Sequence, residues 1–170
     1  RRCMKKSKGS FLFSGLLGLM VFLLLLTVAI ESSRAALHAM DSLYTQWELA
    51  RAAGDFRARV ETYLRYSVDS VVVGEDRAGS QLLCYGHKGS VRRKYYLSYS
   101  PTADCELLFM DSWHFHAKKG TNPLTPPHLA VKQLEIRELE PGKILWSMVL
   151  VHRRTGKEKQ IREVFSYGTG

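Results

Sequence analysis

The stretch SFLFSGLLGLMVFLLLLTVAI, residues 10–30, decides the fold of this chain. From Phe11 to Ile30 it carries no charged side chain. A helix rises by about 1.5 Å per residue, so these residues span roughly 30 Å, the thickness of the hydrocarbon core of a bilayer. The sequence therefore predicts a helix that can cross a membrane.

The charges on either side of this apolar run orient it. Five basic residues precede it: Arg1, Arg2, Lys5, Lys6 and Lys8. Because basic residues stay on the cytoplasmic side, we expect a single-pass protein of the cell membrane with a cytoplasmic N-terminus and an extracytoplasmic head. A cleaved secretion signal has a shorter apolar region and a small-residue cleavage site, which residues 31–36, ESSRAA, match poorly.

The net charge does not by itself indicate a nucleic-acid-binding protein. The 170 residues carry a formal net charge of +9, but the five basic residues before the apolar run leave only +9 − 5 = +4. Nucleic-acid-binding domains usually carry a denser basic stripe. Outside the membrane-length segment and its leader, roughly 130 residues are left, which is enough for one small domain.

The helix is expected to continue beyond the membrane. Apolar residues first recur at helical spacing at Ala36, Met40, Leu43, Trp47 and Ala50. A second set follows at Phe56, Val60, Tyr63 and Ser67. Between the sets, Gly54 and Asp55 are poor interior residues that can kink or briefly interrupt the helix. We expect one face of residues 34–66 to lie against a globular head, and a dimerising coiled-coil stalk is the alternative.

The rest of the chain, residues 67–170, is predicted to be a β-rich head. Short runs rich in branched and aromatic residues indicate strands at 71–73, 81–85, 91–99, 105–110, 113–117, 144–152 and 160–167. Residues 153–157 form the turn of the last hairpin, and residues 129–139 fit a strand or a helix. Residues 118–128 contain three prolines and a glycine and are predicted to be a loop. The expected fold class is α+β.

The leader KKSKG, joined to the apolar helix with no spacer, resembles the class III signal of type IV pilins and pseudopilins. In that family a prepilin peptidase cuts after the glycine, here Gly9, and the mature chain would begin at Ser10 and Phe11. The resemblance implies a leader at 1–9, a transmembrane assembly helix at 10–33, an amphipathic helix at 34–66, and a long helix packed on a small antiparallel sheet. The small size and the polar start are most similar to minor pilins of the Gram-positive competence pilus, which takes up DNA.

Ser14 is the residue at which the chain departs from the family pattern. The family's usual glutamate at the fifth mature position is thought to pair with the N-terminal amine of a neighbouring subunit, and Ser14 cannot form that ion pair. Family members without the glutamate are typically minor subunits. The resemblance therefore implies a minor pilin that helps assemble a filament with other pilin subunits through residues such as Phe11 and Ser14, reaches the cell surface when assembled, and needs no cofactor.

Two other functions stay open. The first is an uncleaved, signal-anchored surface protein with a β-rich head that binds a ligand or an envelope partner. The second is a weak contact between the head and DNA, because basic residues lie beside aromatic ones. The residues concerned are Lys88, Arg92, Arg93 and Lys94, with Tyr95, Tyr96 and Tyr99, and also Arg153, Arg154, Lys157 and Lys159 at the last turn. Alternating charges on the outer face of a sheet produce the same pattern.

The cysteines permit two arrangements. Cys3 lies in the leader, so Cys84 and Cys105 remain in the exported head. A disulfide between them would close a loop of about 20 residues and contribute on the order of 3 kcal/mol in the chain-entropy model. Two separate thiols fit the sequence equally well.

Neither a metal site nor an enzyme is predicted. His114 and His116 would share one face of a strand, and His87 or His128 could join them, but no cysteine or carboxylate accompanies them at a diagnostic spacing. The chain has no G-x-S-x-G elbow, no phosphate-binding glycine loop and no H-E-x-x-H motif.

Overall fold

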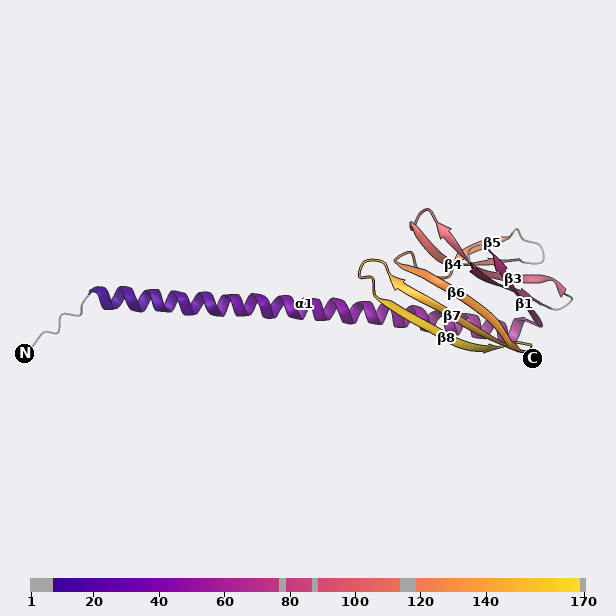
Figure 1. Ribbon diagram of the computed structural model, residues 1–170, viewed down its shortest axis with the longest axis horizontal. Helices are drawn as coiled ribbons and strands as arrows, with labels where there is room; N and C mark the ends of the chain where they lie inside the picture. Colours follow the sequence, from indigo (N-terminus) through magenta and orange to yellow (C-terminus); the bar gives the residue numbers. More distant parts are fainter. Residues whose placement is uncertain (1–7, 77–78, 87–88, 114–118, 169–170) are drawn as a thin grey trace, which may run out of the picture. The chain divides into compact units, whose positions relative to one another are not determined.

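A computed structural model describes residues 8–76, 79–86, 89–113 and 119–168. In these residues, helix α1 (Lys8–Ser67) is followed by eight strands, which confirms the α+β class (Figure 1). The chain divides into two units, Arg1–Tyr44 and Thr45–Gly170. The first unit contains the beginning of α1, and the second contains the rest of the helix and all of the strands.

The strands of the second unit form two antiparallel sheets. The five-stranded sheet has the order β1-β2-β3-β4-β5, and the three-stranded sheet has the order β6-β7-β8. The strands are β1 (Ser70–Asp76), β2 (Gly79–Tyr85), β3 (Val91–Ser100), β4 (Cys105–Ser112), β5 (Gly120–Pro123), β6 (Leu129–Glu140), β7 (Lys143–His152) and β8 (Glu158–Ser166). Strand β6, at the edge of the three-stranded sheet, lies against β2 and β4 of the five-stranded sheet.

Most of the predicted strands are confirmed, and residues 129–139 belong to a strand rather than a helix. The prediction of a loop at 118–128 is wrong in part, because β5 pairs with β4 there, with Pro123 opposite Phe109. Strand β5 is an edge strand, and an edge tolerates a proline because one of its sides makes no ladder hydrogen bonds. Of the strand predicted at 113–117, residues 114–117 lie outside the described residues.

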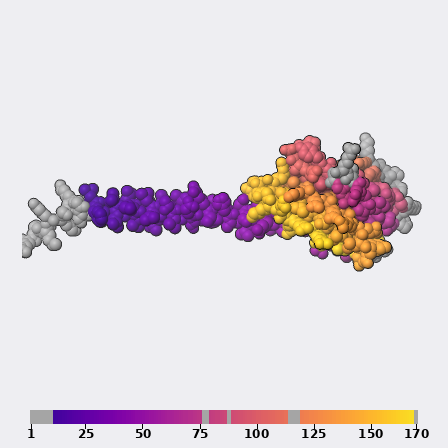
Figure 2. Space-filling view, viewed as in Figure 1, coloured from indigo at the N-terminus to yellow at the C-terminus, as the bar shows by residue number. Residues whose placement is uncertain are grey.

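The core of the second unit is built around Trp146 of β7, whose side chain is fully buried. The ring of Phe56 from α1 lies 5.1 Å from that of Trp146, and the ring of Tyr95 from β3 lies 5.6 Å from it. Phe165 of β8 adds a perpendicular ring contact with Trp146. One tryptophan thus joins the helix to both sheets, and the β7–β8 hairpin covers part of this segment of α1 in the space-filling view (Figure 2).

The helix packs with a different face from the one predicted for its middle section. Met40, Leu43 and Trp47 are exposed, by 66 %, 65 % and 53 %, whereas Leu49 is buried. Further along α1 the prediction is better, because Phe56 and Val60 are buried and Tyr63 is half-buried. Ser67, the last residue of the predicted face, is exposed, and Leu64 is buried instead. The helix is also unbroken at Gly54 and Asp55, contrary to the suggested interruption.

Candidate functional site

The first candidate site is the apolar surface of α1 in the first unit. Every side chain from 11 to 30 is exposed, with Phe11 at 84 % and the more covered Leu26 still at 45 %. This segment is long and apolar enough to cross a membrane. A continuous apolar surface of this extent is unfavourable in water. Lipid or the apolar helices of other subunits can cover it.

Two polar side chains in and next to this segment, those of Thr27 and Ser33, form hydrogen bonds with the backbone of the helix itself. The Thr27 hydroxyl donates to the carbonyl of Leu24 at 2.8 Å, and the Ser33 hydroxyl donates to the carbonyl of Ala29 at 2.8 Å. Since hydrocarbon offers no hydrogen-bond partners, such internal bonds remove the cost of burying a hydroxyl in a membrane. The segment is therefore chemically suited to lipid over its whole length.

The residues predicted to be processed lie at the start of α1. Gly9 and Ser10 have helical backbone conformation, and their side chains lie outside the described part of the structure. Phe11 and Ser14 follow one helical turn apart, and both are exposed. Phe11 and Ser14, which the sequence analysis predicts to be assembly residues, thus lie on the exposed surface of the apolar helix.

Exposed apolar side chains continue past the membrane-length segment. Leu37, Met40, Leu43 and Tyr44 are all more than half exposed. These side chains therefore form an exposed apolar surface in the first unit and not the packed face that the sequence predicted.

The two cysteines of the head do not form a disulfide. Both are free thiols; Cys84 is buried and Cys105 is half-buried. On the intervening strand β3, Cys84 pairs with Arg93 and Cys105 pairs with Ser100. Those partners are seven residues apart (100 − 93), or about 23 Å along the strand, whereas a disulfide needs Cα atoms within about 7 Å. Burial raises the pKa of the Cys84 thiol to about 12.

The basic and aromatic residues predicted as a DNA contact are divided between two faces of the five-stranded sheet. Arg93 and Tyr95 face α1, and the guanidinium of Arg93 lies 3.6 Å from the centre of the Tyr63 ring. Lys94 and Tyr96 face outward, with the Lys94 ammonium 4.9 Å from the Tyr96 ring centre. The split follows from the alternation of side chains along β3.

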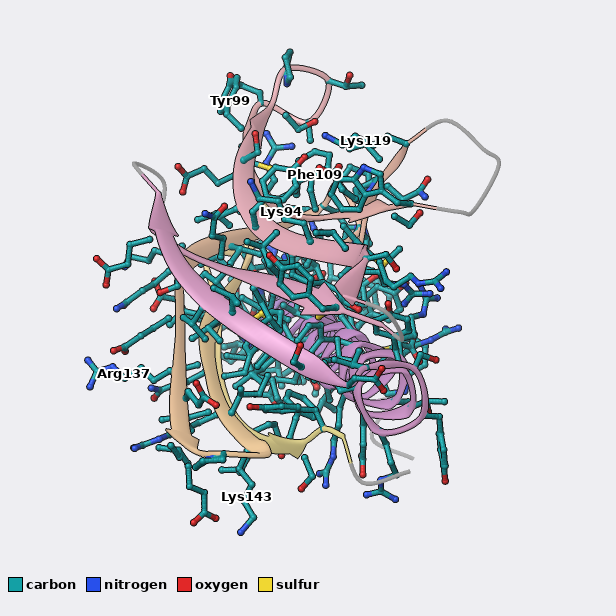
Figure 3. The ribbon with its side chains drawn as sticks, turned by 90° about the vertical axis from the view of Figure 1, so that its right-hand side faces the viewer. Lys94, Tyr99, Phe109, Lys119, Arg137 and Lys143 are labelled. Atoms are coloured by element: carbon teal, nitrogen blue, oxygen red, sulfur yellow. The ribbon has the colours of Figure 1, made fainter. Side chains whose placement is uncertain are left out.

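The outward face carries a charged network centred on Asp111. The Tyr96 ring stacks on that of Phe109. Figure 3 labels Phe109 together with Lys94 and Lys119. The Asp111 carboxylate accepts hydrogen bonds from Tyr96 at 3.1 Å and Thr121 at 2.7 Å, and pairs with Lys119 at 2.7 Å. Burial alone would raise the pKa of Asp111, but the hydrogen bonds from Lys119, Thr121 and Tyr96 outweigh it and lower the pKa. Since Asp111 engages Lys119, this network is a structural element of the sheet edge.

The other predicted groups are placed as follows. Lys88 and the histidines His87, His114 and His116 lie outside the described residues. Arg153 donates to the carbonyl of Pro127 at 3.4 Å. In the described part of the chain, no three His, Cys, Asp or Glu side chains are grouped so that they could hold a metal ion.

A cluster of His152, Glu48 and His128 was not predicted from the sequence; His152 is 4 % exposed, whereas the side chain of His128 is 51 % exposed. The Thr155 amide donates to Nδ1 of His152 at 3.3 Å, and Nε2 of the same ring donates to the Glu48 carboxylate at 3.1 Å. His128 lies 3.9 Å from the same carboxylate. Glu48 and His152 are 104 residues apart, and no local motif connects them. The cluster ties the β7–β8 turn to α1 within the second unit.

Comparison with protein families, curated proteins and solved structures finds no match for this chain.

Proposed function

We propose that the chain is a minor subunit of a type IV pilus-like filament. Among such subunits, its proposed counterparts are the minor pilins of the Gram-positive competence pilus. In this role a prepilin peptidase removes residues 1–9 by cutting between Gly9 and Ser10. Residues 11–30 hold the subunit in the membrane before assembly. The same apolar surface then packs against the helices of other pilin subunits.

The observation that carries this proposal is the single helix α1. It provides an exposed apolar surface of membrane length in the first unit and the packed helix of an α+β head in the second. A plain anchor needs only the first of these features. The helix α1 also supplies core residues of the head, such as Phe56 and Leu64. The helix that would hold the subunit in a filament is therefore the same helix on which the head is packed.

Exposed residues beyond the membrane-length segment support assembly with other proteins. Lipid tails can cover residues 11–30, but Leu37 and Met40 lie further along the helix. Burying apolar surface contributes about 25 cal/mol per Å², so exposed leucines and methionines on one helix favour contact with another helix. Other pilin-like subunits are the proposed partners.

The chemistry of Ser14 favours a minor subunit. A carboxylate in the membrane is costly unless it is paired with a cation, and a hydroxyl carries no such cost because it can bond within its own helix. Ser14 therefore inserts easily and offers no partner to the N-terminal amine of another subunit. Such a subunit suits a position at which that ion pair is not required.

Substitution at the cleavage site tests the proposal. Gly9→Val should leave the leader attached, so that the protein in a strain with the complete filament machinery migrates as the longer form and is missing from sheared filaments. Gly54→Val is the matched control on the same helix: Gly54 is exposed and lies outside residues 11–30, and a Cβ there has no neighbour within 4 Å, so processing and incorporation should be normal.

The alternative function gives a different result. An uncleaved surface protein anchored by the same helix would keep its full length whether residue 9 is glycine or valine. Identical migration of the wild type and the Gly9→Val variant would contradict the pilin proposal and favour the anchored surface protein.

A further inference from the structure

The second unit contains a cleft between the end of α1 and strand β3. It has two adjoining parts, of about 610 Å³ and 390 Å³. Both parts are lined by Tyr63, Tyr66, Ser67 and Arg93, so they form one continuous depression. A cleft of this size accommodates a few residues of an extended peptide.

The smaller part concentrates positive charge through an unusual placement of two consecutive arginines. Side chains at 92 and 93 of a regular strand would point to opposite faces, yet both line this part. The Arg92 side chain lies across Gly86, where a Cβ would come within 2.8 Å of its Cγ and 2.9 Å of its Nε. The register shift between Cys84 and Tyr85 lies just before this glycine. The pairing of β2 with β3 passes over Arg92, and the glycine at 86 leaves room for its side chain, so Arg92 lines this part of the cleft together with Arg93.

Arg93 has no carboxylate partner among the described residues. Its guanidinium lies on the face of Tyr63 and bonds to Tyr95. Arg59, an exposed residue that lines the larger part, also forms no ion pair within the described chain. A partly buried guanidinium binds a carboxylate strongly, through two parallel hydrogen bonds. Asp69 lines the smaller part of the cleft. No acidic residue is among the described residues that line the larger part beside Arg59 and Arg93, so a carboxylate is the group that would complement these two arginines.

The larger part of the cleft is apolar. Its wall includes Ala58, Val60, Met110 and Leu124. A bulky aliphatic or aromatic side chain would be removed from water there at a favourable free energy, and the flexible Met110 can adapt to its shape. The two parts together call for a ligand with a carboxylate next to a large apolar group.

We propose that this cleft binds a peptide segment of a partner protein in which a carboxylate lies next to a bulky apolar residue. The carboxylate pairs with Arg93 and Arg59, and the apolar side chain enters the part lined by Val60, Met110 and Leu124. This inference does not depend on the assembly function of α1.

Two features favour a peptide over a single-stranded nucleic acid. Bases bind by stacking on open aromatic faces, but one face of Tyr63 is already occupied by Arg93. Aliphatic side chains, which give bases no stacking surface, form much of the larger part.

Fluorescence anisotropy with the full-length chain in detergent micelles tests this proposal. The probe is the labelled peptide Gly-Ser-Glu-Leu-Glu-Ser-Gly, whose centre copies the segment Glu138, Leu139 and Glu140, in which this chain itself displays an exposed leucine between two carboxylates. Saturable binding is expected, with a dissociation constant about tenfold higher when both glutamates of the probe are glutamines.

Variants of the protein locate the site. Arg93→Gln should raise the dissociation constant for the glutamate probe about tenfold. Arg59→Gln, at an exposed position, makes the same test if Arg93→Gln does not fold. The matched control is Arg162→Gln, an exposed arginine of β8 outside the cleft, which should leave binding unchanged.

Four results would overturn the proposal. They are no binding of the peptide at millimolar protein, equal binding of the glutamine probe, an equal loss in the Arg162→Gln control, and tighter arginine-dependent binding of a twelve-nucleotide oligothymidylate. The last result would assign the cleft to nucleic acid.

Discussion

Replacing Leu49 with alanine should destabilise the head, although the apolar spacing of the sequence favours Trp47 as the packed residue. Leu49 is only 3 % exposed and belongs to the core cluster. The substitution removes three buried carbon atoms, which is about 2.4 kcal/mol at roughly 0.8 kcal/mol each. An incompletely collapsed cavity raises the expected loss of unfolding free energy to about 3 kcal/mol.

Leu43→Ala is the matched control, because it makes the same chemical change on the same helix at a side chain that is 65 % exposed. Its effect should stay within about 0.5 kcal/mol. Thermal unfolding of the full chain in detergent, followed by near-ultraviolet circular dichroism of the aromatic core, measures both variants. We expect Leu49→Ala to lower the Tm by roughly 10–15 °C and Leu43→Ala to lower it by no more than a few degrees. Equal shifts, or a larger shift for Leu43→Ala, would refute the assignment of the packed face.

Three further predictions concern the head. Iodoacetamide should modify the half-buried Cys105 in the native protein and should modify the buried Cys84 only after unfolding. If the mass of the unreduced head were lower than that of the reduced head by two hydrogen atoms, the two cysteines would form a disulfide, which would contradict the free thiols. Asp111→Asn should cost about 1–3 kcal/mol at neutral pH. Because folding lowers the pKa of Asp111, its contribution is present above its unfolded pKa of about 3.9 and lost as the pH falls through the folded value, so acid titration of stability should be shallower in the variant. His152→Ala should cost about 1–3 kcal/mol and increase amide exchange at the β7–β8 turn, and unchanged exchange there would contradict the tie to Glu48.

The elements with strong periodicity could be predicted from the sequence. An uncharged apolar run of membrane length predicts a helix without any tertiary information, and alternation of branched residues predicts the strands. The packed face of the helix between residues 36 and 50 could not be predicted in the same way. Leu49 and Trp47 belong to two helical faces that both carry apolar residues, and only the partners in the strands decide which of them is buried.

The functional groups of the head were harder to predict than its strands. The sequence indicated a basic and aromatic cluster, but strand alternation places Arg93 and Lys94 on opposite faces. The register shift between β2 and β3 and the room at Gly86 let Arg92 line the same part of the cleft as Arg93, and no sequence motif indicates this. Whether Cys84 can form a disulfide with Cys105 also depends on strand register, because the pairing of β2 and β4 with β3 sets the distance between the two cysteines.

The intact mass of the chain, purified from cells that contain a prepilin peptidase, tests the central claim most directly. The pilin proposal predicts a mature protein that begins at Ser10, with or without a methyl group on its amine, and that keeps the whole apolar segment. A protein that still carries residues 4–9, or one that has lost residues 11–30, would contradict it.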